Sequence, residues 1–127
     1  MRRNDWVTLA DLGSFHFRHQ KYDEAEKDFR AVVALVPDSP LQHRNLGGVY
    51  IEMGRFMDAE RELLKSIELA ATPSAYSNLG ALYIYLGRYP DAIVALNKAI
   101  QLPSAQLATN YKVWGNLADA YRYTPDE

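Results

Sequence analysis

The 127-residue chain is predicted to be all-α, a stack of repeated helical hairpins. Leucine recurs at Leu12, Leu46, Leu79 and Leu117, which are 34, 33 and 38 residues apart, and self-similarity at such a period is typical of helical repeats. Glycine follows the first three of these leucines, and alanine follows the fourth. Apolar residues between them recur at the spacing of one helix face. We therefore expect three hairpins and one additional helix within a single domain, residues 1–127.

The first hairpin is predicted within residues 6–39. The apolar residues of its second helix recur every three or four positions, at Tyr22, Ala25, Phe29 and Val33. His16 stands where later hairpins have tyrosine, and Gln20 stands where they have a turn glycine. Because glycine is the residue that tolerates positive φ, we expect the turn at Gln20 to be strained or differently shaped.

The second and third hairpins are predicted within residues 40–72 and 73–106. Gly54 and Gly87 each end a first helix, and Pro90 suits the first turn of the helix that follows. Glycine also occurs in the middle of each first helix, where it costs about 1 kcal/mol relative to alanine. We therefore expect close helix contact at these glycines, in the pairs Gly13 with Ala25, Gly47 with Ala59, and Gly80 with Ala92.

The last helix, within residues 107–127, is predicted to be a partial repeat or a cap. The segment from Leu102 to Tyr111 holds four extra residues, so this helix either starts earlier or follows a longer loop. Its signature residues are Trp114, Leu117, Ala118 and Tyr121. Because a final solenoid helix needs a polar outer face, we expect more chain or a partner to cover them, and we expect the sequence to be a piece of a longer protein.

The combined motif resembles the tetratricopeptide repeat (TPR) family over almost the entire chain. Its most complete copy comprises Leu79, Gly80, Tyr83, Gly87, Tyr89 and Ala92. Pro37 near the end of the first unit and Trp114 at the start of the last also match. The resemblance implies a right-handed solenoid of helix pairs, whose first helices line a concave groove that holds peptides or partner proteins.

Within that groove, an asparagine precedes three copies of the leucine motif. The amide of asparagine both donates and accepts hydrogen bonds, and the set resembles the asparagine ladder by which some TPR proteins grip a peptide main chain. The predicted groove residues are Asn45, Asn78, Asn116, Phe17, Arg18, Arg44, Ile51, Ile84, Tyr85, Lys112 and Arg122. The alternative is that the asparagines serve local helix packing and the other side chains contact neighbouring helices.

A clamp for a C-terminal carboxylate, as in chaperone-binding TPR members, is not expected. The resemblance would require lysine and asparagine where this chain has Ala10 and Ser14. It would also require basic residues where Ser74 and Asn78 stand.

Composition narrows the remaining function classes. The net charge of -2 gives no reason to expect nucleic acid, and the absence of cysteine excludes disulfides. No run approaches the roughly 18 apolar residues of a membrane span, and no signal core follows Arg2 and Arg3, so we expect a cytoplasmic protein without membrane insertion.

No catalytic motif stands out, and we expect neither enzyme activity nor a cofactor. His16 and His19 have a metal-compatible spacing, but His16 fits the aromatic position of the repeat, and no metal site is expected. The leading hypothesis is a non-catalytic scaffold that binds a peptide or protein segment. The alternatives are self-association into a homo-oligomer through the C-terminal helix, or a regulatory segment of a larger enzyme.

Overall fold

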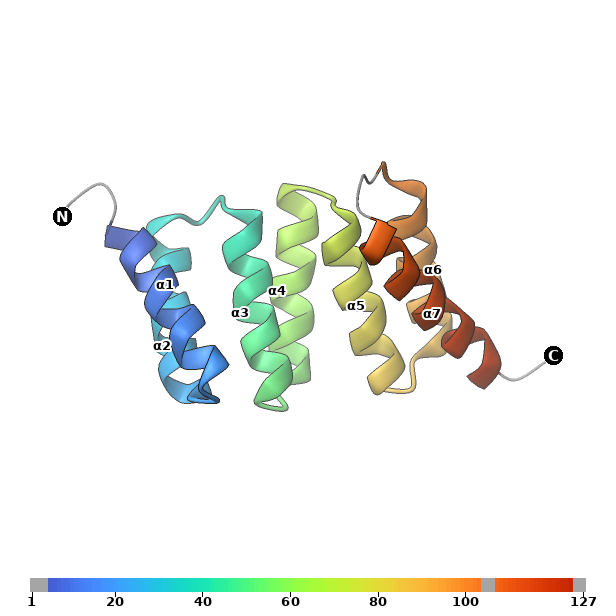
Figure 1. Cartoon of the computed structure of the whole chain (residues 1–127), viewed down its shortest axis with the longest axis horizontal. Coiled ribbons are helices and arrows are strands. Elements are labelled where there is room, and N and C mark those ends of the chain that lie inside the picture. Colours follow the sequence, from blue (N-terminus) through green and yellow to red (C-terminus); the bar gives the residue numbers. More distant parts are fainter. Residues whose placement is uncertain (1–4, 104–106, 125–127) are drawn as a thin grey trace. The chain divides into compact units, whose positions relative to one another are not determined.

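Every regular element in the described residues is an α-helix. The computed structural model describes residues 5–103 and 107–124, with the side chains of 107–112 outside the described part. The helices are α1 (Asp5–Arg18), α2 (Tyr22–Leu35), α3 (Pro40–Glu52), α4 (Phe56–Leu69), α5 (Pro73–Tyr85), α6 (Tyr89–Gln101) and α7 (Leu107–Tyr123) (Figure 1). The prediction of an all-α helical repeat is confirmed. The chain divides into two compact units, Met1–Leu69 and Ala70–Glu127, which are considered separately below as unit 1 and unit 2.

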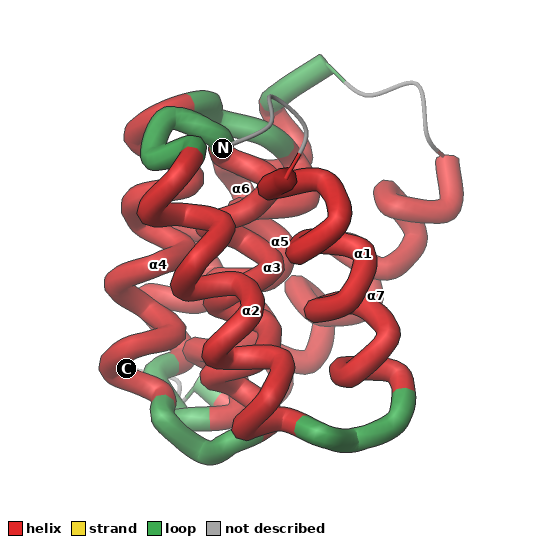
Figure 2. Tube along the Cα trace, turned by 90° about the vertical axis from the view of Figure 1, so that its left-hand side faces the viewer, coloured by secondary structure: helices red, strands yellow, loops and turns green. Residues whose placement is uncertain are grey.

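Unit 1 contains two helical hairpins, α1–α2 and α3–α4, joined by contacts between α2 and α3. The side view of Figure 2 places α1 and α4 to either side of α2. The core is filled by apolar side chains of three helices, namely Ala25, Phe29 and Val32 of α2, Leu46 and Val49 of α3, and Ala59 and Leu63 of α4. Ser66 of α4 is also buried, and its hydroxyl donates to the Pro40 carbonyl at 2.8 Å, which ties α4 to the start of α3.

Unit 2 contains the α5–α6 hairpin, with α7 packed against both of its helices. Leu96 and Ala99 of α6 form a buried cluster with Val113 and Leu117 of α7. Leu117 lies ten residues after the start of α7 (117 − 107), whereas its counterpart Leu79 lies six residues after the start of α5 (79 − 73). The four extra residues therefore make the last helix start earlier, which was the first of the two predicted alternatives.

Local sequence signals account for several helix starts. Proline begins α3 at Pro40 and α5 at Pro73, where a missing N–H leaves no hydrogen bond unmade. Ser39 and Thr72 precede them and accept hydrogen bonds from the backbone N–H groups of Gln42 and Ala75, at 3.4 and 3.2 Å. Side chains of this type commonly cap helices in this way. Pro90 lies in the first turn of α6, as predicted.

The three hairpin turns share one hydrogen-bond pattern. The N–H groups of Lys21, Arg55 and Arg88 each donate to the carbonyl five residues earlier, in every case at 2.8 Å. This is the Schellman arrangement, which requires a left-handed residue just after the helix. Gly54 and Gly87 supply it with φ of 75°, and Gln20 supplies it with φ of 61° as the one non-glycine residue of positive φ in the described chain. Of the two alternatives predicted for the turn at Gln20, the positive φ of a residue with a side chain fits strain, and the shared hydrogen bonds show that the turn is not differently shaped.

The mid-helix glycines make the predicted close contacts, but chiefly with other residues than expected. A Cβ added at Gly80 would lie 2.5 Å from Leu96, one at Gly13 would lie 2.9 Å from Phe29, and one at Gly47 would lie 3.1 Å from Leu63. These neighbours follow the predicted Ala92, Ala25 and Ala59 by four residues, and of the three alanines Ala59 alone provides one of the nearest atoms. Helical side chains lean toward the N-terminus of their own helix, so the large side chain one turn later, a phenylalanine or a leucine, covers the spot opposite the alanine.

Candidate peptide-binding surface

In unit 1 the predicted groove residues lie on α1 and α3 and differ in their exposure. Arg18 is exposed, whereas Phe17, Arg44, Asn45 and Ile51 are half-buried. The ring of Phe17 packs edge-on against Tyr22 of α2, with the centroids 5.6 Å apart.

Asn45 has a partner on its own helix. Its Nδ2 donates to Oε1 of Gln42 at 3.4 Å, a long hydrogen bond between residues one turn apart. This contact corresponds to the local packing role that the sequence left open for the asparagines.

In unit 2 the asparagines lie on two helices that contact each other. Asn78 of α5 and Asn116 of α7 are half-buried, and neither side chain has a hydrogen-bond partner within the described part of the chain. An amide carries two N–H donors and a carbonyl acceptor, so both side chains keep their capacity to bind a peptide backbone.

The remaining predicted residues of unit 2 differ in their surroundings. Ile84 packs partly buried against the core cluster of α6 and α7, so it supports the attachment of α7. Tyr85 is 74% exposed. Arg122 is exposed and lies 3.9 Å from the carboxylate of Asp119. The side chain of Lys112 lies outside the described residues.

The two histidines considered for a metal each have a separate partner. Nδ1 of His16 lies 2.6 Å from a carboxylate oxygen of Asp28, and Nδ1 of His19 donates to the Phe15 carbonyl at 2.9 Å. Across the residues that the structure describes, no three His, Cys, Asp or Glu side chains gather to hold a metal ion. None of the helices in that part is long and apolar enough to cross a bilayer.

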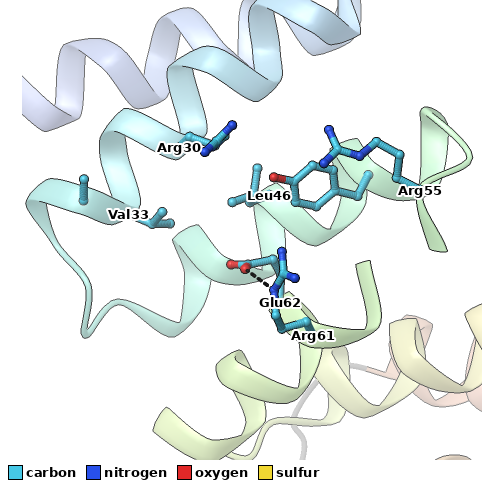
Figure 3. Close-up of a pocket in the computed structure, with 8 residues that line it drawn as sticks. Arg30, Val33, Leu46, Arg55, Arg61 and Glu62 are labelled. Carbon is cyan, nitrogen blue, oxygen red and sulfur yellow. Dashed lines mark ion pairs between the residues drawn. The ribbon is translucent and has the colours of Figure 1, made fainter. Parts of the chain in front are cut away.

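A pocket that the sequence did not predict lies between α2, α3 and α4 of unit 1 (Figure 3). Its cavity volume is about 380 Å³, and its lining residues are Arg30, Val33, Ala34, Leu46, Tyr50, Arg55, Arg61 and Glu62. At the position of Arg30 the other hairpins carry Leu64 and Asn97. At the position of Arg61 they carry Lys27 and Val94. That departure from the repeat is the sequence signal that points to the pocket.

Tyr50 forms part of the pocket and is almost fully buried, with 3% of its surface exposed. Burial raises the pKa of its phenol, and the nearby carboxylate of Glu26, which accepts a hydrogen bond from that phenol, raises the pKa further. Arg55 donates to the same Glu26 carboxylate at 2.6 Å and to Asp58 at 2.9 Å. Glu62 accepts a hydrogen bond from His43 Nδ1 at 2.8 Å.

Known proteins resemble the chain in sequence and in fold. Residues 41–105, more than half of the chain, match a family model described as tetratricopeptide repeat, and residues 7–36 match a second model of that description. A protein O-mannosyl-transferase of Caenorhabditis elegans is 34% identical over 59 residues, which are 46% of this chain. The chain thus spans only 9% of the length of that curated relative.

Two solved structures show the fold likeness. The Yersinia enterocolitica type III secretion chaperone SycD, in complex with a peptide of the translocator YopD, has a TM-score of 0.88 at 18% identity, with 95% of each chain covered. The first TPR of Spaghetti (RPAP3), bound to the HSP90 peptide SRMEEVD, has a TM-score of 0.84 at 20% identity, covering 96% of this chain and 94% of that one. With the family-model matches, these observations show that the chain belongs to the tetratricopeptide repeat family.

Proposed function

We propose that this chain is a non-catalytic interaction module that holds a peptide or protein segment against the first helices of its repeats. The observation that carries the proposal is the pair Asn78 and Asn116, two half-buried amides on contacting helices without side-chain partners in the described chain. A half-buried amide is most stable when its hydrogen bonds are made, and an extended peptide backbone offers matching groups. Tyr85 and Arg122 are exposed on the same two helices and supply an aromatic ring and a guanidinium.

The solved relatives support a peptide as the ligand class. SycD is in complex with a peptide of YopD, and the first TPR of Spaghetti is bound to an HSP90 peptide. In this chain Ala10 and Ser14 replace the cation and amide that a carboxylate clamp of the chaperone-binding type would need. We therefore propose recognition of the peptide main chain, with Arg18, Arg44, Ile51 and Phe17 of unit 1 as further contact residues.

The test is a comparison of two variants on a peptide selected from a display library with the wild-type chain. Asn78→Ala combined with Asn116→Ala removes both amides, whereas Asn97→Ala on α6 is a matched control on another helix. Each lost hydrogen bond contributes a net 0.5–1.5 kcal/mol, so the double variant should bind about tenfold more weakly or worse. Fluorescence anisotropy gives the affinities. Equal affinity for the double variant and the wild type would reject the proposal.

Self-association through α7 is a second candidate, because one face of that helix is open. Tyr121 is 57% exposed, whereas Tyr50 and Tyr83, which occupy the same position in earlier repeats, are 3% and 8% exposed. Trp114, on the same helix as Tyr121, is 56% exposed. An exposed aromatic stripe of this kind marks many protein interfaces. Sedimentation velocity over a range of concentrations tests the idea, and a strict monomer would exclude it.

A role as a segment of a larger enzyme is a third candidate, favoured by the match to the protein O-mannosyl-transferase. In that case catalysis would reside in residues beyond this sequence, and the repeats would recruit or position a substrate protein. The full reading frame tests this directly, since it must then encode a catalytic domain.

A further inference from the structure

We propose that the pocket between α2, α3 and α4 binds an acidic segment of a partner polypeptide, with one carboxylate held by Arg30 and a neighbouring aliphatic residue placed against Val33, Ala34 and Leu46. The pocket is lined by residues of unit 1, none of which is among the predicted groove residues, so this inference goes beyond the function proposed above. Figure 3 shows Arg30 extending from α2 toward the side chain of Arg55, with Leu46 beside them.

Arg30 is the cation of the pocket that remains available for a ligand. It is exposed, and the described chain contains no hydrogen-bond or ion-pair partner for it. The other two arginines are already engaged, because Arg55 pairs with Glu26 and Asp58, and Arg61 lies 3.0 Å from Asp58 and 3.7 Å from Glu62. A guanidinium presents its donors in a planar fork that suits a carboxylate.

The ion pairs around the pocket leave one guanidinium without a carboxylate. Arg55 and Arg61 pair with the carboxylates of Glu26, Asp58 and Glu62, and none of these pairs includes Arg30. The side chains of Glu26 and Glu62 are only 15% and 13% exposed, so water screens them weakly. A dianionic phosphoryl group would be repelled by these carboxylates more strongly than a carboxylate would be. The observations therefore favour an acidic side chain over a phosphorylated one.

The apolar part of the pocket supplies the second contact. Val33 and Ala34 of α2 and Leu46 of α3 line it alongside the arginines. Burial also raises the pKa of the neighbouring Tyr50 phenol, which indicates that part of this region is withdrawn from water. A segment that joins an aliphatic and an acidic residue matches both parts of the lining.

The repeat itself does not require a cation at the position of Arg30. Arg55 has basic counterparts in Lys21 and Arg88, so a cation there belongs to the hairpin turn. Arg30 corresponds to Leu64 and Asn97, residues without a positive charge. A charge present in one hairpin and absent from the others indicates a local task.

The experiment is an NMR titration of the 127-residue chain with three blocked tripeptides, each acetylated and amidated. Leu-Glu-Leu carries the proposed ligand chemistry, Leu-Gln-Leu removes the charge, and Leu-phosphoserine-Leu carries the phosphoryl alternative. The titration is repeated with Arg30→Gln and with Lys27→Gln, a matched loss of charge at an exposed residue of the same helix that does not line the pocket. The dispersion of each variant's own spectrum shows that it is folded.

The proposal expects Leu-Glu-Leu to shift the backbone amides of the pocket residues and to bind more tightly than either other probe. Arg30→Gln should weaken this binding about tenfold, as expected for the loss of one charge-assisted hydrogen-bonded pair. Lys27→Gln should leave the affinity within about twofold of the wild type. Equal binding of Leu-Gln-Leu, tighter binding of the phosphoserine peptide, shifts confined to other helices, or unchanged affinity in Arg30→Gln would each overturn it.

Discussion

The guanidinium carbon of Arg55 lies 4.6 Å from the centroid of the Tyr50 ring. The residue that precedes α4 thereby covers the last turn of α3, and the same guanidinium reaches Glu26 on α2 at 2.6 Å. Arg88 lies over Tyr83 in the same way in unit 2, at 4.4 Å. In unit 1 the tyrosine, the arginine and Glu26 connect three helices, so this cluster joins the first hairpin to the second.

Tyr50→Phe should lower the free energy of unfolding by about 1–2 kcal/mol, because it deletes the hydrogen bond from the phenol to the Glu26 carboxylate while keeping the aromatic ring. Urea denaturation followed by circular dichroism measures the change. Tyr76→Phe is the matched control, since the Tyr76 hydroxyl has no hydrogen-bond partner among the described residues, and it should have little effect. Equal losses in both variants would contradict this account of Tyr50.

The Tyr50 phenol also predicts a pH dependence of stability at alkaline pH. Its pKa in the folded chain is raised above the ordinary value of 10.0, so above that pH the unfolded chain releases this proton before the folded chain does. The unfolded state then binds fewer protons, and stability falls as the pH rises. Unfolding free energies measured between about pH 9 and pH 11 should fall more steeply for the wild type than for Tyr50→Phe. Parallel curves would exclude the contribution.

Gln20→Gly should stabilise the first hairpin, because the left-handed conformation costs a residue with a side chain roughly 1–2 kcal/mol and costs glycine nothing. Part of this gain is lost again, because glycine has more conformational entropy in the unfolded chain. We expect a gain of up to about 1 kcal/mol. Gly54→Gln is the reciprocal change at the equivalent turn of α3 and should destabilise. Apart from its neighbours along the chain, no described atom lies within 4 Å of a Cβ built at Gly54, so that loss would come from the backbone and not from a clash. Thermal unfolding of both variants gives the comparison, and a destabilised Gln20→Gly would contradict it.

Gly80→Ala should destabilise the chain by about 1–3 kcal/mol, because the added Cβ would lie 2.5 Å from Leu96 in the core of unit 2. Gly48→Ala provides the contrast on α3. Apart from the backbone of its own helix and its chain neighbours, no described atom lies within 4 Å of a Cβ at that position. Alanine is also the better helix former by about 1 kcal/mol, so this variant should be stabilised. Denaturant midpoints of the two variants should therefore move in opposite directions, and a shift in the same direction would refute the packing argument.

The fold followed from the sequence to the extent that its signals were local. Gly54 and Gly87 identified helix ends because few residues other than glycine adopt a positive φ. Gln20 stood out because it occupies the equivalent position without being glycine. The glycine contacts needed more than the helix wheel. The wheel placed Gly80 opposite α6 but could not tell Ala92 from Leu96, which share a face one turn apart.

The candidate binding residues were harder to predict, because their surroundings depend on neighbouring helices. Asn45 and Asn78 occupy equivalent positions, yet a glutamine one turn earlier satisfies Asn45, whereas Ala75 stands at that place before Asn78. Arg30 and Arg61 lie on polar helix stripes that a periodicity argument assigns to solvent. Their common pocket arises only when α2 and α4 approach the same part of α3.

The shared turn pattern of the three hairpins has a consequence for chirality. A backbone at φ near +75° with open space around the Cβ direction is the natural conformation of a D-amino acid, by mirror symmetry with the ordinary preference of L-residues. D-alanine at positions 54 and 87 would suit each turn and restrict the unfolded chain more than glycine does. The hairpin turns thus favour a backbone conformation that, among the encoded residues, glycine adopts most easily. Gln20 is the position where the chain forms the same turn with an L-residue.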